Sequence, residues 1–162
     1  MFRETEDYAR YIRLIRYGLS KETVRILAFV LMPNHLHLLV KIKKAPSLGK
    51  FMQRVQTGYS MYFNFKYEQV GHVFQGRFQN PLVAKDEYLI YVSKYIHRNP
   101  VKAGLCGRAA EYPWSSYKDY LGEGTFDFID TSIIEEVFVA NFSNNFKVDY
   151  SKFVDETEDC PR

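Results

Sequence analysis

The chain has 162 residues, 46% hydrophobic and 25% charged, which suits one compact domain with at most a short appendage. No apolar run approaches the roughly 18 residues needed to span a bilayer. The N-terminus is charged from its third residue and lacks the apolar core of a signal peptide. Two cysteines, Cys106 and Cys160, lie far apart without a CxxC pattern, which predicts neither a disulfide framework nor a thiolate zinc site. We therefore expect a cytoplasmic protein.

The net charge of +3 is unevenly distributed along the chain. Residues 125–162 carry nine acidic and three basic side chains, a net charge of −6, which leaves +9 on residues 1–124. A basic body with an acidic tail is typical of proteins that bind a polyanion such as nucleic acid, although many basic domains bind none.

The first predicted element is a helix over residues 5–17, where apolar side chains recur at helical spacing. Thr5 is its candidate N-cap and Gly18 its candidate stop. Residues 23–31 are apolar and rich in β-branched side chains, which predicts a buried strand, and residues 35–43 predict a second strand after a Pro-Asn break.

The middle of the chain predicts two longer helices. Residues 47–66 have the length and periodicity of a helix capped by Ser47. Residues 72–84 predict an irregular strand or hairpin. Residues 85–99 predict a helix that is acidic at its start and ends at Pro100.

Two short helices are predicted near residues 114–121 and 131–140. Strands mixed with helices, two of the strands being closely joined, predict an α+β fold in which helices pack on one face of an antiparallel sheet.

The first candidate for chemistry is the pair His35 and His37. Side chains two apart on a strand share one face, so the two imidazoles would project side by side and could share one cation. The alternative is a pair of hydrogen-bonded histidines with a structural role.

The second candidate is the pair Tyr95 and Asn99, which are four residues apart and therefore stacked on one helical face. The Asn99 carbonyl oxygen is a hard ligand that suits Mg²⁺ or Mn²⁺. The Tyr95 phenol could attack phosphorus. By spacing alone the alternative is that Tyr95 packs in the core.

Four stretches, FVLMPNHLHLLV, GHVFQGRF, YVSKYIHRNPVKAGL and YPWSSYKDYL, follow one another along the chain. Together they resemble the REP-associated tyrosine transposases, a branch of the single-tyrosine HUH transposases of bacterial insertion sequences. The resemblance covers roughly residues 5–121 and implies a ferredoxin-like fold. We expect a transposase domain over residues 1–121 and an acidic, partly helical C-terminal extension over residues 122–162.

The resemblance implies roles for single residues. Tyr95 is the implied nucleophile, and His35, His37 and Asn99 are the implied ligands of Mg²⁺ or Mn²⁺. Arg77 resembles a DNA-contact residue of the family, its alternative being an ordinary surface arginine. Other tyrosines share the chemistry but not the motif: Tyr59, Tyr62, Tyr88 and Tyr91.

Family members usually begin with a strand upstream of the first helix, whereas this chain starts close to that helix. Either the start codon is misplaced, the gene is decayed, or the sheet lacks this N-terminal strand.

The activity that the resemblance implies is nicking and rejoining of single-stranded DNA next to a hairpin element, through a 5′-phosphotyrosine. The partner is single-stranded DNA with palindromic elements, no membrane is involved, and the protein is a monomer or homodimer. A basic cluster after the second strand could follow a DNA backbone, or could simply form a solvated face. Its members are Lys41, Lys43, Lys44, Lys50 and Arg54.

Three other functions compete with this interpretation. The first is a catalytically silent, domesticated DNA-binding protein. The second is a replication-initiator or relaxase nickase, which shares the chemistry but usually has a longer chain. The third is a phosphodiesterase with paired histidine motifs, which requires a second HxT or HxS motif that the sequence lacks.

Overall fold

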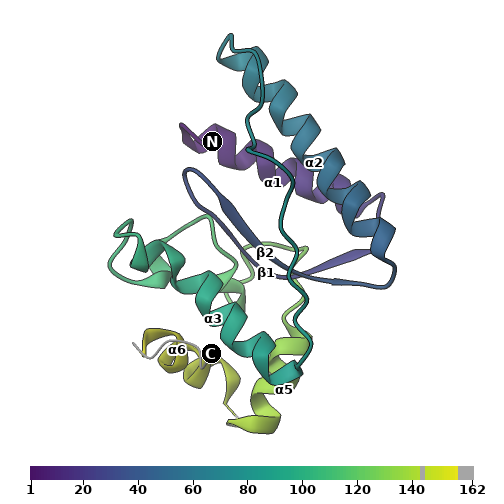
Figure 1. Ribbon diagram of the computed structural model, residues 1–162. Coiled ribbons are helices and arrows are strands. Elements are labelled where there is room, and N and C mark those ends of the chain that lie inside the picture. The colour runs from purple at the N-terminus through teal and green to yellow at the C-terminus, as the bar shows by residue number, and fades with distance from the viewer. Residues whose placement is uncertain (143–144, 157–162) are drawn as a thin grey trace. The chain divides into compact units, whose positions relative to one another are not determined.

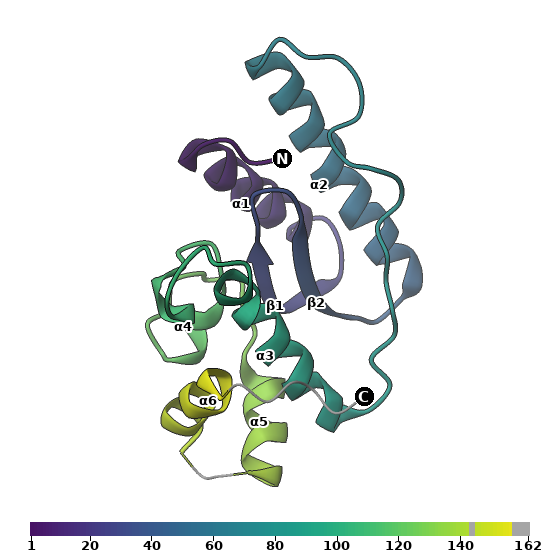
Figure 2. The same cartoon turned by 60° about the vertical axis from the view of Figure 1, so that its left-hand side comes forward.

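The computed structural model describes residues 1–142 and 145–156. Its elements follow one another as α1 (Thr5–Leu19), β1 (Val24–Leu31), β2 (Leu36–Ile42), α2 (Ala45–Lys66), α3 (Asp86–Lys102), the 3-10 turn η1 (Ala109–Glu111), α4 (Tyr117–Tyr120), α5 (Ser132–Asn141) and α6 (Phe146–Asp155). Figures 1 and 2 label the helices and strands. The predicted α+β class is confirmed. No helix in the described part of the chain is both long and apolar enough to cross a membrane. Cys106 is a free thiol, and Cys160 lies outside the described residues.

The sheet consists of β1 and β2, paired antiparallel across a four-residue connection. All but one residue of β1 are buried. Single bridges join this strand to Ile129 and Ser115, so later parts of the chain continue its hydrogen bonding. Residues 1–4, the described segment before α1, form no strand.

The chain divides into two compact units. The first consists of Met1–Arg25, Pro33–His35 and Lys41–Pro81, and the second of Ile26–Met32, Leu36–Val40 and Leu82–Arg162. Residues 122–156 belong to the same unit as α3. The transposase domain over residues 1–121 and the C-terminal extension over residues 122–162 stay a prediction.

In the first unit, α1 and α2 lie side by side (Figures 1 and 2) and approach closely at two glycines. A Cβ on Gly18 would lie 2.9 Å from the Phe51 ring, and one on Gly58 would lie 2.9 Å from Leu14 Cδ2. The prediction that Gly18 stops the first helix is therefore wrong, because Gly18 lies inside α1, where it lets the helices meet.

Two other predictions near these helices are corrected. The second helix begins at Ala45 after the N-cap Lys44, with Pro46 in its first turn, so Ser47 is not the cap. Proline suits this position because its missing N–H is not needed there. Residues 72–84 form no strand or hairpin and instead run as irregular chain.

Asp7 is the polar centre of the first unit. Its carboxylate is fully buried and accepts hydrogen bonds from five donors. The donors are the backbone N–H groups of Arg3 and Glu4, the phenols of Tyr62 and Tyr67, and the Lys66 ammonium. Burial alone would raise the pKa of this carboxyl, but the donors outweigh burial and lower its pKa to about 2.

We expect Asp7 to make stability depend on pH. Because its pKa is lower when folded, the unfolded chain binds more protons between about pH 4 and pH 2, and stability falls as pH falls through that window. The wild type should lose about 2 kcal/mol there, and Asp7→Asn should lack this loss while being less stable at pH 7. Urea unfolding measures both.

The control is Glu6→Gln, which changes an exposed carboxylate one residue earlier in the same helix. It should keep the wild-type dependence on pH. An Asp7→Asn protein with the same acid sensitivity as Glu6→Gln would refute this role of Asp7.

Candidate active site

The helix that carries the predicted nucleophile is α3. Its first turn holds Asp86 and Glu87, which complement the positive end of the helix dipole. The helix continues through Pro100 to Lys102, so the predicted stop at Pro100 is wrong. It ends where Gly104 adopts a positive φ of 69° and Leu105 N–H donates to the Pro100 carbonyl at 2.9 Å.

Two faces of α3 have opposite environments. On one face, Tyr88 and Tyr95 are 44% and 46% exposed. On the other face, Ile90, Ser93 and His97 are fully buried. Tyr95 is therefore exposed to solvent, while the opposite face of the same helix is buried in the core.

Tyr95 contacts His37 of β2, within the second unit. Their ring centroids lie 5.5 Å apart with an interplanar angle of 78°, an edge-on contact. The Lys102 ammonium lies 5.8 Å from the Tyr95 ring centroid. The structure thus brings the second histidine of the HxH motif, His37, to the tyrosine of the YxxxN motif.

Asn99 lies one turn after Tyr95 and is half-buried. Its Nδ2 donates to the Tyr95 carbonyl oxygen at 2.8 Å. This bond uses the amide nitrogen, and the carbonyl oxygen Oδ1 is the atom with which Asn99 could ligate a cation.

His35 is the last residue before β2 and belongs to the first unit. Its Nδ1 lies 2.7 Å from Asn34 Oδ1, so Nδ1 carries the proton in the neutral ring. Nε2 is then the nitrogen with a lone pair, as in metal-ligating histidines whose other nitrogen donates to an oxygen.

The predicted ligand set consists of two imidazoles and one amide. The amide oxygen is a hard ligand that suits Mg²⁺ or Mn²⁺, whereas imidazole nitrogen is a ligand of transition-metal ions, so the set as a whole fits Mn²⁺ better than Mg²⁺. Within residues 1–142 and 145–156, no group of three or more histidine, cysteine, aspartate or glutamate side chains could hold a metal ion. The predicted set contains only two such side chains, because its third ligand is the oxygen of Asn99. The roles of His35, His37 and Asn99 therefore stay a prediction.

On the buried face of α3, His97 is the centre of a directed chain of hydrogen bonds. Its Nδ1–H donates to Tyr150 Oη at 2.9 Å, and Tyr150 donates to Ser93 at 2.9 Å. On the other side, Ser116 Oγ lies 2.8 Å from His97 Nε2 and accepts the Phe29 backbone N–H. Burial lowers the pKa of His97 to about 3, so the ring is neutral.

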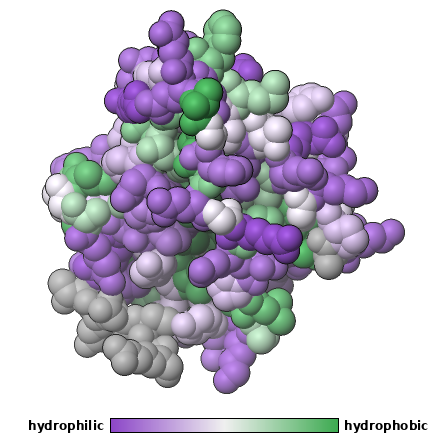
Figure 3. Space-filling view, turned by 45° about the horizontal axis from the view of Figure 1, so that its top comes forward, coloured by the Kyte–Doolittle hydropathy of each residue, from purple (hydrophilic) through white to green (hydrophobic). Residues whose placement is uncertain are grey.

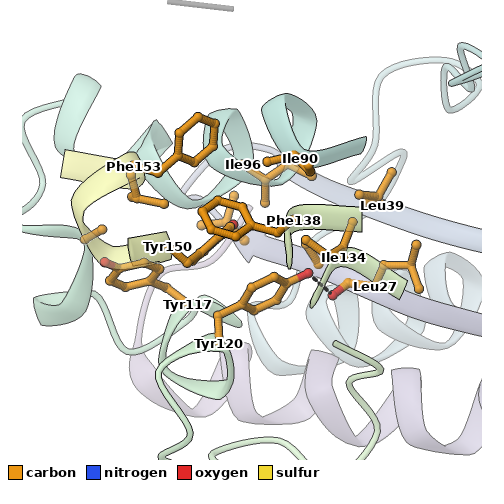
Figure 4. Packing of buried hydrophobic residues seen from close by; sticks show 14 of the residues in the cluster. Leu27, Leu39, Ile90, Ile96, Tyr117, Tyr120, Ile134, Phe138, Tyr150 and Phe153 are labelled. Atoms are coloured by element: carbon orange, nitrogen blue, oxygen red, sulfur yellow. Dashed lines mark hydrogen bonds between the residues drawn. The ribbon is translucent and has the colours of Figure 1, made fainter. Parts of the chain in front are cut away.

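The C-terminal segment holds this face of α3 in place. The Lys94 ammonium lies 4.3 Å from the Phe153 ring centroid, and Arg98 donates to the Glu156 carbonyl oxygen. Figure 4 shows side chains of the same core, in which the ring centroids of Phe138 and Tyr150 lie 5.7 Å apart. Sequence reasoning missed this network, although the spacing of residues 90, 93, 94 and 97 is that of a buried helical face.

The rival tyrosines lie in different surroundings. Tyr59 is fully buried and donates to the Met1 carbonyl oxygen, and burial raises its pKa. Tyr62 donates to Asp7. Tyr91 packs against Phe153. Of the four, Tyr88 alone matches the exposure of Tyr95.

The predicted DNA-contact residues are exposed and lie in the first unit. Lys41 is on β2, Lys43 and Lys44 follow that strand, Lys50 and Arg54 are on α2, and Arg77 is in the segment between α2 and α3. Arg54 also lies 3.5 Å from Glu22. Their exposure permits contact with a phosphate backbone, which stays a prediction.

Comparison with known proteins gives two matches, one to a family model and one to a solved structure. The family model described as "Transposase IS200 like" matches residues 1–99. A solved structure of a REP-associated tyrosine transposase bound to a REP hairpin has a similar fold, with a TM-score of 0.63 and 18% sequence identity over 79% of this chain and 77% of that chain. No curated protein matches this sequence.

The hydrogen bonds around His97 predict that Tyr150→Phe destabilises the folded protein. This change leaves the buried His97 Nδ1–H without an acceptor, which should lower the free energy of unfolding by about 1–3 kcal/mol. Chemical denaturation at pH 7 measures it. Tyr88→Phe, an exposed change on α3, should stay within about 0.5 kcal/mol of wild type. Equal stabilities of the two variants would mean that the Tyr150 hydroxyl does not support His97.

Proposed function

Because this chain belongs to the IS200-like transposase family, we propose that it nicks and rejoins single-stranded DNA beside hairpin elements, with Tyr95 as the nucleophile. The observation that best supports this proposal is the contact between the exposed Tyr95 and His37 of the HxH motif. The related structure is bound to a REP hairpin, which supports hairpin DNA as the partner.

His35 Nε2, His37 and Asn99 Oδ1 are the atoms or groups that would hold a divalent cation, Mg²⁺ or Mn²⁺. When bound, such a cation supplies Lewis-acid polarisation of a non-bridging phosphate oxygen. The chain's own contribution is to orient the ligands. Asn34 fixes the His35 ring, and the Tyr95 carbonyl fixes the Asn99 amide.

The covalent step is an in-line displacement at phosphorus. Tyr95 Oη forms a bond to the phosphorus while the bond from phosphorus to O3′ breaks. The phenolic proton leaves to solvent, which reaches Tyr95 because its side chain is about half exposed. The departing O3′ takes up a proton, so the products are a 5′-phosphotyrosine and a free 3′-hydroxyl.

The reverse step joins strands. The phosphotyrosine conserves the energy of the phosphodiester, so a second 3′-hydroxyl can attack the phosphorus and release Tyr95 without ATP. This property distinguishes a strand transferase from a nuclease that passes the phosphoryl group to water.

The substrate must be single-stranded near the cut, because the scissile phosphate has to reach a side chain on a helix surface. The charge of +9 on residues 1–124 favours a polyanion. The exposed lysines that follow β2 could neutralise phosphates of the strand.

Tyr95→Phe separates cutting from folding and binding. The change removes one oxygen from an exposed ring, so stability and hairpin affinity should stay near wild type. Cleavage should fall by more than about 1000-fold, because the nucleophile is gone. The measurements are cleavage of a hairpin-flanked single strand and detection of a covalent protein–DNA adduct on a denaturing gel.

The matched control is Tyr88→Phe, which removes the same atom from a ring of similar exposure two turns earlier on α3. It should keep both cleavage and adduct. An adduct that persists in Tyr95→Phe and disappears in Tyr88→Phe would show that Tyr88, and not Tyr95, is the nucleophile. A wild type that binds hairpins but never forms an adduct would support a silent DNA-binding protein instead.

His37→Ala tests the ligand role. Losing one of three ligands should weaken the cation site, so the cleavage rate at low Mn²⁺ should fall by at least about 100-fold, and high Mn²⁺ should restore it in part. Hairpin binding in EDTA serves as the internal control and should change by less than about threefold. Wild-type cleavage that proceeds unchanged in EDTA would contradict a metal-dependent mechanism.

A further inference from the structure

A pocket of about 360 Å³ lies in the first unit, between α2 and the segment 71–76. The segment that follows α2 turns back and runs beside this helix (Figures 1 and 2). The pocket volume falls within the range of small-ligand sites, about 300–1,000 Å³. The pocket is independent of Tyr95, which belongs to the second unit.

The segment 71–76, which forms the wall opposite α2, makes two kinds of contact with the rest of the first unit. Asn64 Nδ2 donates to the Gly71 carbonyl oxygen at 3.0 Å. The Phe74 ring packs between the rings of Tyr59 and Tyr11, with centroid distances of 6.1 and 6.4 Å. These contacts join the segment to the α1–α2 core.

The lining combines hydrogen-bonding groups with an aromatic ring. Hydroxyl, amide and imidazole groups come from both walls, together with the thioether of Met61. The polar and aromatic residues that line the pocket are Gln56, Thr57, Ser60, Asn64, His72 and Phe74. None of the described lining residues carries a carboxylate, ammonium or guanidinium group. Such a lining suits a neutral, flat molecule with donors and acceptors on its edge, and it offers no fixed charge to a phosphate.

Cations lie beside the pocket on the same stripe of α2. Arg54 and Lys50 precede Thr57 by three and seven residues, which is about one and two helical turns. Both are exposed. A polyanionic backbone could therefore follow α2 up to the pocket without entering it.

Large apolar side chains are exposed next to the pocket. Met61 and Phe65, four residues apart on α2, are 69% and 89% exposed. Apolar residues interrupt a largely hydrophilic surface in the space-filling view (Figure 3). An exposed ring of this kind is a stacking surface for an unpaired base.

We propose that this pocket takes one unpaired nucleobase of the DNA strand, while Lys50 and Arg54 neutralise the neighbouring phosphates. The inference rests on the proposed function, since it assumes a single-stranded DNA substrate, and adds a base-reading site to it. Amide and hydroxyl groups of Gln56, Thr57 and Ser60 then meet the edge of the base. The strand is selected for unpaired bases as well as for charge.

The test compares oligonucleotides of equal length, each enriched in one of the four bases, with an abasic strand in which tetrahydrofuran replaces every nucleoside. Binding to the full chain is measured by fluorescence anisotropy in EDTA over a range of salt. The wild type should bind at least one base-bearing strand about tenfold more tightly than the abasic strand.

Ser60→Leu fills the pocket and should remove this tenfold preference, leaving affinity for the abasic strand and the dependence on salt unchanged. Gln53→Leu is the matched control, because it introduces the same side chain at an exposed position of α2 outside the pocket, and it should keep the preference. If Ser60→Leu does not fold, Gln56→Ala, which removes a lining amide, replaces it with the same expected loss.

Three results would overturn the inference. The first is equal wild-type affinity for abasic and base-bearing strands, and the second is a preference that survives in Ser60→Leu. The third is a loss of the preference in Gln53→Leu as well. A protein that binds no single strand in a salt-dependent way would instead overturn the proposed function, and the pocket inference with it.

Discussion

The position of α3 depends on one neutral, buried imidazole. A buried polar group is costly unless it is hydrogen-bonded, and His97 meets this condition with a donor on one side and an acceptor on the other. Through Ser116 the ring is connected to the backbone of β1, and through Tyr150 it is connected to α6. Three segments that lie far apart in the sequence therefore share one chain of hydrogen bonds.

This arrangement also explains how two motifs from different parts of the sequence meet. His37 lies on β2, which pairs with β1, and Tyr95 lies on α3, which the His97 network connects to β1. Both side chains are thus positioned relative to the same strand. The acidic C-terminal segment contributes Tyr150 and Phe153 to the core, so it supports the site without supplying any of its predicted chemistry.

Elements with strong periodicity could be predicted from the sequence, and so could the pairing of HxH with YxxxN. The predictions that the structure corrects concern Gly18, Ser47, residues 72–84 and Pro100. Pro100 lies in the last turn of α3, and the helix closes after it through the positive φ of Gly104 and the hydrogen bond from Leu105 N–H to the Pro100 carbonyl. Gly18 looked like a stop because its role, room for the Phe51 ring, depends on a helix that follows later in the chain.

The network around His97 was harder to predict for the same reason. Local patterns identify a buried position on α3, but they do not identify Tyr150 or Ser116 as its partners, which lie 53 and 19 residues away. Aromatic residues such as Phe74 illustrate a further difficulty. Its contacts with Tyr11 and Tyr59 anchor an irregular segment that has no periodic signal of its own.

The two faces of α3 have a consequence for how a lineage of such proteins changes. Natural selection for a folded chain acts on the face that carries Ser93 and His97, because changes there leave buried groups unpaired. Changes on the exposed face that carries Tyr95 affect folding little, so the same selection acts only weakly there. If Tyr95 is the nucleophile, as proposed, loss of cutting and loss of folding would be separate events. A genome that gains from DNA binding alone would then keep the folded protein after its chemistry had decayed.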